Sequence, residues 1–223
     1  MNLLLKEKLA LVSGSTAGIG LAIAEGLARE SATVIVNGRS KPRVANAIET
    51  IRQKYPGSQV KGFAGDLSTV EGFELLKTEY PDVDILVNNL GIFNPQPFEE
   101  ISDEEWRRFF EVNVLSGVRL SRYYLPRMKN KGWGRIVFIS SESGIQIPAE
   151  MIHYGCTKTA QLAISRGLAE STVGTGITVN AVLPGRPRPR ALATLLLSWR
   201  RRQSNLRANS KSIFSKRYVR RAS

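Results

Sequence analysis

A short apolar run, a glycine-rich turn and the start of an amphipathic helix follow one another within the first thirty residues. Residues 8–13 predict a buried strand, and glycines lie directly after it at positions 14, 18 and 20. Apolar residues then recur at helical spacing. Such a turn aims backbone N–H groups and the positive end of a helix at one place, which suits a phosphate group. The spacing G-x-x-x-G-x-G differs from the commoner dinucleotide pattern, and an ordinary strand–helix connection is the alternative.

Strand-like and helix-like patterns alternate through the first 185 residues. The strand runs are apolar without alternation, as in parallel sheets that are covered on both faces. We therefore expect an α/β fold, a doubly wound parallel sheet of Rossmann-like type whose ligand lies outside the carboxyl ends of the strands. Strands are predicted at residues 9–13, 33–37, 59–64, 85–88, 135–140 and 178–183, and helices at about 18–30, 41–54, 69–79, 102–130 and 153–174.

A tyrosine and a lysine four residues apart supply a candidate acid and the means to activate it. On a helix, Tyr154 and Lys158 lie one turn apart and project together. A fixed positive charge favours the phenolate and moves the pKa of a tyrosine down from about 10. Ser141 ends the preceding strand run, so its hydroxyl is expected beside the phenol. The pair by itself is also typical of a solvated helix face, so the interpretation depends on the other motifs.

The end of the second predicted strand bears on the choice of cofactor. An acid there would bind the adenosine ribose hydroxyls and repel a 2′-phosphate. This chain has no carboxylate at that place and carries Arg39, followed by Ser40. A guanidinium suits a 2′-phosphate, although a solvated loop arginine is the alternative. We predict NADP as the cofactor, with NAD possible.

Five motifs, in order, resemble the short-chain dehydrogenase/reductase family, and the resemblance runs from about residue 5 to residue 185. Two mild departures are a serine at position 13, where the family usually has threonine, and a leucine at position 90, where it usually has alanine. Neither departure removes a group that the chemistry needs. The matching motifs are Ser13-Gly-Ser-Thr-Ala-Gly-Ile-Gly20, Gly65-Asp66-Leu67, Asn88-Asn-Leu-Gly91, Asn113 in a helix, and Ser141 with Tyr154 and Lys158.

The resemblance implies an oxidoreductase that moves hydride between NADP(H) and a carbonyl or alcohol substrate. It implies that Ser141 binds the substrate oxygen, that Tyr154 transfers the proton, and that Lys158 lowers the tyrosine pKa and binds the nicotinamide ribose. Asn113 is expected to hold a water that connects Lys158 to solvent. The cofactor-binding residues it implies are Gly14, Ser15, Thr16, Gly18, Ile19, Gly20, Arg39, Ser40, Asp66 at the adenine edge, Leu67 against the adenine face, Asn89, Gly91, Tyr154, Lys158, Pro184 and Gly185.

The composition of the chain limits which kinds of site and which cellular compartments are expected. The single cysteine excludes an intrachain disulfide, and with a single histidine it also argues against a metal site, so no metal is expected. No secretory leader and no run of about 18 apolar residues are apparent, so we expect a cytoplasmic protein without a membrane contact. The expected partner is a small-molecule substrate, with no specific nucleic acid. Homo-oligomers are usual in the family and doubtful for this chain.

The last 38 residues differ sharply from the rest. Residues 186–223 hold twelve of the 32 basic residues and none of the 19 acidic ones, so residues 1–185 are nearly neutral. We predict a dinucleotide-binding and catalytic domain at 1–185 and a basic, non-native or disordered tail at 186–223. One hypothesis is a tail that binds polyanions or an anionic membrane.

A second hypothesis is a one-base deletion near codon 185. In the shifted frame, the codons permit the Pro-Thr pair that family members usually carry after the glycine, and residues 213–223 permit the segment before their last strand. The fold would then lack its last strand and its substrate-loop helices. The alternative function is therefore an inactive, frameshifted relic that keeps weak nucleotide binding and a polyanion-binding tail.

Overall fold

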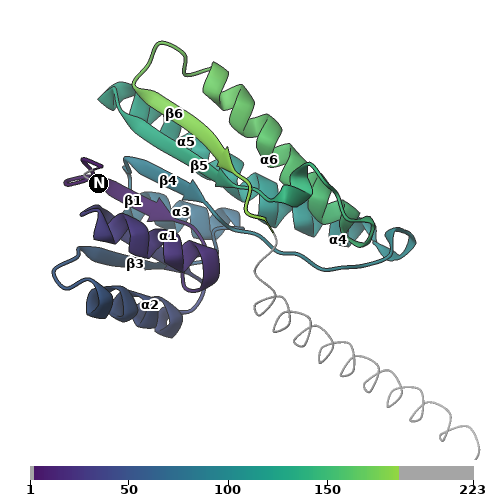
Figure 1. The fold of residues 1–223 in the computed structure, drawn as a ribbon, viewed down its shortest axis with the longest axis horizontal. Coiled ribbons are helices and arrows are strands. Elements are labelled where there is room, and N and C mark those ends of the chain that lie inside the picture. Colours follow the sequence, from purple (N-terminus) through teal and green to yellow (C-terminus); the bar gives the residue numbers. More distant parts are fainter. Residues whose placement is uncertain (1–2, 186–223) are drawn as a thin grey trace, which may run out of the picture. The chain divides into compact units, whose positions relative to one another are not determined.

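The computed structural model describes residues 3–185. The predictions for the basic tail, including its order and the shift of frame, lie outside these residues. Met1–Pro184 form one compact unit. Its centre is a parallel sheet with the strand order β3-β2-β1-β4-β5-β6 (Figure 1). The predicted doubly wound α/β fold is confirmed.

The elements follow one another as strand and helix in alternation. The strands are β1 (Leu9–Val12), β2 (Thr33–Gly38), β3 (Val60–Ala64), β4 (Ile85–Asn88), β5 (Gly134–Ile139) and β6 (Ile177–Val182). The helices are α1 (Gly18–Arg29), α2 (Lys41–Lys54), α3 (Val70–Glu79), α4 (Asp103–Phe110), α5 (Ser116–Lys131) and α6 (Ile152–Glu170), with short turns η1 (Phe98–Glu100), η2 (Glu111–Leu115), η3 (Glu142–Gly144) and η4 (Ala149–Met151).

The strand order reverses next to β1, and this reversal decides where a ligand can lie. β1 pairs with β2 on one side and with β4 on the other, so the chain leaves β1 and β4 toward opposite halves of the sheet. Loops that diverge in this way open a crevice at the carboxyl ends of the strands. The turn after β1 and the segments after β4 and β5 therefore meet at one edge.

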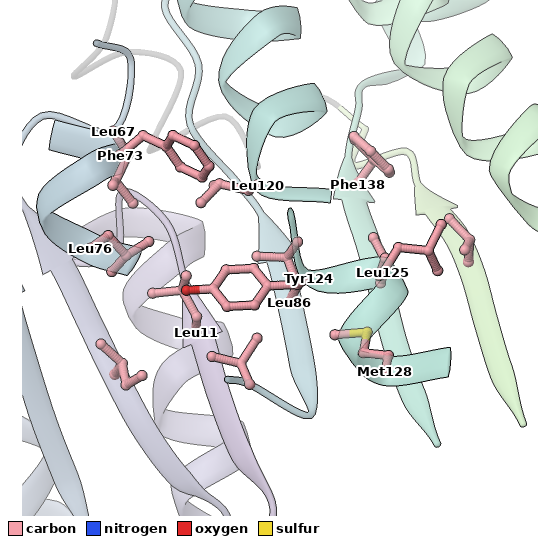
Figure 2. Packing of buried hydrophobic residues seen from close by; sticks show 14 of the residues in the cluster. Leu11, Leu67, Phe73, Leu76, Leu86, Leu120, Tyr124, Leu125, Met128 and Phe138 are labelled. Carbon is pink, nitrogen blue, oxygen red and sulfur yellow. The ribbon is translucent and has the colours of Figure 1, made fainter. Parts of the chain in front are cut away.

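Two apolar clusters cover the two faces of the sheet. Alternate strand residues point to opposite faces, so Leu11 belongs to one cluster and Val12 to the other. The larger cluster packs α3, α5 and α6 on the sheet, and the second packs α1 and α2. Figure 2 shows the ring of Tyr124 from α5 beside Leu11 and Leu86, and its hydroxyl donates to the Tyr80 carbonyl at 2.8 Å.

The predicted single helix over 102–130 is three segments. Ser102 caps α4 by accepting from the Glu105 N–H, and a π-helical turn, η2, follows before α5 begins. In η2 the Ser116 N–H reaches back to the Glu111 carbonyl. Apolar periodicity does not reveal one wide turn, because the residues on both sides keep helical spacing. Such turns are frequent at functional sites.

β6 forms one edge of the sheet. It pairs with β5 and with no other strand of residues 3–185. Ile177 and Val179 are buried under α6, whereas Thr178, Asn180 and Val182 on the other face of the strand are exposed. The described residues thus contain six strands and no seventh. Within the same residues, no helix is long and apolar enough to cross a membrane.

The single histidine lies in the first turn of α6, packs against α4, and has no hydrogen-bond partner in the described part of the chain. His153 is fully buried, and its ring is 4.0 Å from the Phe109 ring and 6.0 Å from the Trp106 ring. Burial lowers its pKa, Glu105 opposes this and Arg108 adds to it. The imidazole is therefore buried in its neutral form.

Acid is expected to destabilise the chain through this histidine. The pKa of His153 is lower in the folded than in the unfolded chain, so the unfolded state binds more protons, and stability falls as the pH falls through about 6.5. Urea unfolding at pH 7.0 and 5.5 measures the loss, which is at most about 1.4 kcal/mol per pH unit for one group. His153→Phe should flatten this slope whatever its stability at pH 7.0. An unchanged slope would contradict the assignment.

Candidate active site

The glycine turn after β1 leaves a cradle beside the first turn of α1. Gly14 and Gly18 have φ angles of 61° and 58°, in the left-handed region that favours glycine. A Cβ at Gly20 would lie 2.5 Å from both the Asn89 side-chain nitrogen and the Gly14 carbonyl oxygen. No side chain caps α1, and its first turn carries no acid. The free N–H groups of this turn suit a phosphate, so the cradle fits a dinucleotide.

Two asparagines hold the turn in place. Asn37 at the end of β2 accepts from the Gly14 N–H at 3.0 Å and donates to the carbonyl oxygens of Phe63 and Gly65. Asn89 donates to the carbonyl oxygens of Ser13 and Gly14, both at 3.0 Å. Asn37 is a residue whose role the sequence analysis missed. A buried asparagine at a strand end, beside a glycine turn, is the signal that would have found it.

Ser15 and Thr16 stabilise the turn through hydrogen bonds and packing contacts with other residues of the chain. The Ser15 hydroxyl donates to the Val12 carbonyl and accepts from the Asn37 N–H, and its own N–H donates to the Asn37 carbonyl. The hydroxyl and the N–H of Ser15 are therefore used within the protein, and its predicted cofactor contact stays a prediction. Thr16 packs against Gly38, where a Cβ would come within 2.5 Å of its methyl group.

The ends of β2 and β3 form the side of the crevice where an adenosine is expected. The Arg39 side chain is 80 % exposed and lies 4.0 Å from an Asp66 oxygen. The other Asp66 oxygen accepts from the Ser68 N–H and hydroxyl at 3.0 and 2.6 Å. Ser40 follows at the start of α2, and Pro42 lies in its first turn. Most N–H donors of the Arg39 guanidinium therefore remain exposed to solvent.

Leu67 does not offer its side chain to a ligand. It is 1 % exposed and lies in the core with Phe73 and Leu76, as Figure 2 shows. The expected contact of this side chain with an adenine face is wrong, because α3 packs on the sheet through it. The neighbouring Asp66 remains partly exposed and stays a candidate.

Tyr154 and Ser141 lie at the carboxyl end of β5. Burial raises the pKa of Tyr154, and the Ser141 hydroxyl partly opposes this. The phenol is thus kept as a proton donor at neutral pH. This differs from the expectation that Lys158 lowers the tyrosine pKa, since the burial of the phenol outweighs its favourable contacts here. Ser141 also accepts from the Ser143 N–H at 3.1 Å.

Lys158 is a buried cation one turn along α6. Its side chain is held by the Ile139 carbonyl at 2.9 Å and by the Gln161 side-chain oxygen at 3.2 Å, and it lies 5.5 Å from the centre of the Tyr154 ring. Burial lowers its pKa to about 8. The ammonium therefore carries its charge at neutral pH and begins to lose it just above.

Asn113 joins the site from the π-helical turn η2. Its side chain accepts from the Ile92 N–H at 2.7 Å and donates to the Ile92 carbonyl and to the Thr157 hydroxyl, both at 3.0 Å. Its own carbonyl accepts from Gln161 at 2.5 Å. Asn113 thus ties the segment after β4 to α6. Gln161 is the second residue that the sequence analysis missed, because an isolated glutamine carries no motif.

The remaining predicted residues border these groups. A Cβ at Gly91 would lie 3.5 Å from the Lys158 nitrogen and 3.8 Å from the Asn113 side-chain oxygen, so the glycine keeps this space open. The Pro184 carbonyl accepts from the Glu142 N–H at 3.1 Å beside the segment after β5. Ile19, in the first turn of α1, is half exposed. Gly185 lies beyond the first compact unit and stays a prediction.

Apolar side chains lie beside Tyr154 and its neighbour Gly155. Phe93 meets the Tyr154 ring edge to face with centres 6.2 Å apart, and Phe93 is about half exposed. Ile147 packs against Gly155, where a Cβ would come within 2.5 Å of it. Ile145 is exposed on the same segment after β5. Within residues 3–185, no group of histidine, cysteine, aspartate or glutamate side chains is arranged to hold a metal ion.

A parallel sheet of this order, with a phosphate-type glycine turn after its first strand, defines the Rossmann-like class of nucleotide-binding folds. Residues 8–195 match the family model described as short chain dehydrogenase. The chain belongs to the short-chain dehydrogenase/reductase family, as its motifs predicted. The match extends beyond residue 185, where the sequence analysis ended the resemblance.

Proteins of known name and structure agree with this membership. The chain is 51 % identical over 198 residues to the uncharacterized oxidoreductase YvaG of Bacillus subtilis, covering 89 % of this chain and 75 % of that one. It is 37 % identical to the 3-oxoacyl-[acyl-carrier-protein] reductase FabG of Escherichia coli, covering 80 % and 72 %. L-Sorbose reductase from Gluconobacter frateurii, solved with NADPH and L-sorbose, superposes with a TM-score of 0.77 at 34 % identity, covering 83 % and 72 %.

Proposed function

We propose that this chain is an NADP-dependent oxidoreductase that interconverts a carbonyl compound and an alcohol, with Tyr154 as the general acid and base. The observation that carries the proposal is the meeting of four elements around one space. Tyr154 and Lys158 come from α6, Ser141 from the end of β5, and Asn113 from η2, with Gly91 leaving the space open. Bound NADP(H) would supply or accept the hydride.

Substrate binding, proton transfer and stabilisation of the phenolate fall to residues of the chain. We assign to Ser141 the hydrogen bond to the substrate oxygen, and to Tyr154, whose pKa burial raises, the protonation of that oxygen during reduction. The charged Lys158 stabilises the phenolate that is left behind, because an adjacent positive charge favours the ionised form. Activity should therefore fall as the pH rises through the Lys158 pKa of about 8.

Arg39 supports NADP over NAD. Its guanidinium is exposed at the end of β2 and lies 4.0 Å from the carboxylate of Asp66 at the neighbouring strand end. A planar guanidinium suits a 2′-phosphate, which carries two negative charges. Relatives also favour this choice, since the L-sorbose reductase structure contains NADPH.

Arg39→Ala is expected to weaken NADPH binding about ten-fold and to leave NADH binding unchanged, because one charge-assisted contact is lost. Titration of each reduced cofactor by its fluorescence measures both affinities. Arg29→Ala is the matched control, since Arg29 is exposed at the far end of α1. Equal affinities of the unmutated chain for the two cofactors would show that the NADP assignment is wrong.

The apolar side chains beside Tyr154 favour a substrate with an apolar group next to its carbonyl. Phe93 contacts the Tyr154 ring, and Ile147 lies against the neighbouring Gly155. Burial of such a group against these side chains contributes roughly 25 cal/mol per Å². We keep the cytoplasm as the expected compartment and a small molecule as the expected partner. A homo-oligomer is a proposal from the family alone.

A further inference from the structure

The amide of Gln161 bridges Lys158 and Asn113. Its side-chain oxygen accepts from the Lys158 ammonium at 3.2 Å, and its nitrogen donates to the Asn113 carbonyl at 2.5 Å. Gln161 is 2 % exposed and follows Lys158 by three residues on α6, so the two side chains share one helix face. Both ends of the amide are used, and this fixes which end faces the cation.

Asn113 has little freedom to contact Lys158 by itself. Its side chain is occupied by Ile92 and Thr157, and its carbonyl by Gln161. The bridge therefore joins the π-helical turn to the buried lysine through a protein side chain. The water that Asn113 is expected to hold, connecting Lys158 to solvent, stays a prediction.

Gln161 is the side-chain acceptor that the structure gives to the Lys158 ammonium. The other elements around the nitrogen offer a carbonyl from Ile139 of β5 and the open position at Gly91 after β4. Tyr154 is the titratable side chain that faces Lys158. No carboxylate of the described residues contributes to the lysine pKa, which burial alone lowers. A buried ammonium that loses an acceptor is costly, since less of its charge is then compensated.

We infer that Gln161 is a positioning residue, which keeps the Lys158 ammonium charged, holds it at Tyr154 and ties it to the Asn113 carbonyl. This inference rests on the proposed function for its catalytic meaning. Two substitutions distinguish the effect of losing the hydrogen-bond acceptor from the effect of altered packing. Gln161→Met keeps the length of the side chain and removes both hydrogen bonds. Gln161→Glu keeps an oxygen toward Lys158, adds a charge and removes the donor to Asn113.

A titration that needs no turnover tests the charge of the lysine directly. We would follow the ¹³Cε resonance of Lys158 in lysine-labelled full-length chain between pH 6 and 11, assigned with Lys158→Arg. Gln161→Met should lower the pKa of Lys158 by about one unit, the value of one hydrogen bond to a charged group, and Gln161→Glu should raise it. Ser165→Ala, a small change at a buried position further along α6, should leave it unchanged. If both Gln161 variants titrate like the parent chain, the inference is overturned.

The pH dependence of carbonyl reduction gives the second readout. The alkaline loss of kcat should move to lower pH in Gln161→Met and to higher pH in Gln161→Glu, whereas damage to packing alone would lower kcat equally at every pH. A uniform loss without a shift overturns the positioning role. If the NMR shifts appear and neither parent nor variants reduce any carbonyl compound with NADPH, the bridge is supported and the proposed function fails. The two failures are thus distinguishable.

Discussion

Tyr154→Phe is expected to lower carbonyl reduction by about 10²–10⁴-fold, the usual contribution of a positioned proton donor. The substitution removes one oxygen and keeps the ring, which meets Phe93 at 6.2 Å between centres. The buried neighbourhood that raises the tyrosine pKa is retained, so the loss reports the proton and not the packing. NADPH oxidation with a panel of apolar ketones, beside NADPH binding by fluorescence, measures the two effects separately.

Tyr123→Phe is the matched control for this substitution. Tyr123 lies on α5 against Phe73 and Tyr124 and takes no part in the site, so its variant should keep the parent rate. NADPH affinity should stay within about five-fold in Tyr154→Phe, because a lost neutral contact is worth on the order of 1 kcal/mol or less. Reduction that survives in Tyr154→Phe at the rate of the control would falsify the assignment of Tyr154 as the acid.

Gly20→Val is expected to abolish cofactor binding. A Cβ at this position would already lie 2.5 Å from the Asn89 side chain and from the Gly14 carbonyl oxygen, and two further methyl groups enlarge the clash. The turn must then open, and Asn89 must release the two carbonyls that it holds. We expect NADPH affinity to fall by more than about 100-fold, since the phosphate cradle loses its backbone donors together.

Gly26→Ala is the control on the same helix. Apart from its chain neighbours and the backbone of its own helix, no atom lies within 4 Å of a Cβ at Gly26, and alanine raises helix stability by up to about 1 kcal/mol. This variant should bind NADPH like the parent chain and unfold at the same or a higher urea concentration. If Gly20→Val binds NADPH as tightly as Gly26→Ala, the glycine turn is not the phosphate site.

Most of the fold could be predicted because its signals are local. The apolar runs of the strands and the helical spacing between them placed all six strands and most helices within a few residues. The helix around 102–130 was the exception, since the π-helical turn at Glu111–Leu115 adds a wide turn that keeps the apolar spacing on each side. Asn113 in this turn donates to Thr157 of α6, a tertiary partner that no window of sequence around the turn contains.

The candidate site was predictable where a residue type and a short spacing carried the chemistry. Gly20 and the pair of Tyr154 and Lys158 are of this kind. Leu67 was misplaced because a motif does not say which way a side chain points, and the packing of α3 turned it into the core. The expected low tyrosine pKa failed for a similar reason, because burial of the phenol depends on what covers it.

By itself the sequence determined the alternation of strands and helices, the glycine turn and the membership in the family, because these depend on spacings of a few residues. The tertiary structure alone decided what each buried polar group contacts. Gln161 and Asn113 are 48 residues apart in the chain, and only the packing of η2 against α6 joins them. Asn37 reaches the glycine turn across 23 residues in the same way. A buried polar group must find a partner wherever the fold brings one, so such pairs are set by packing and carry no local signal.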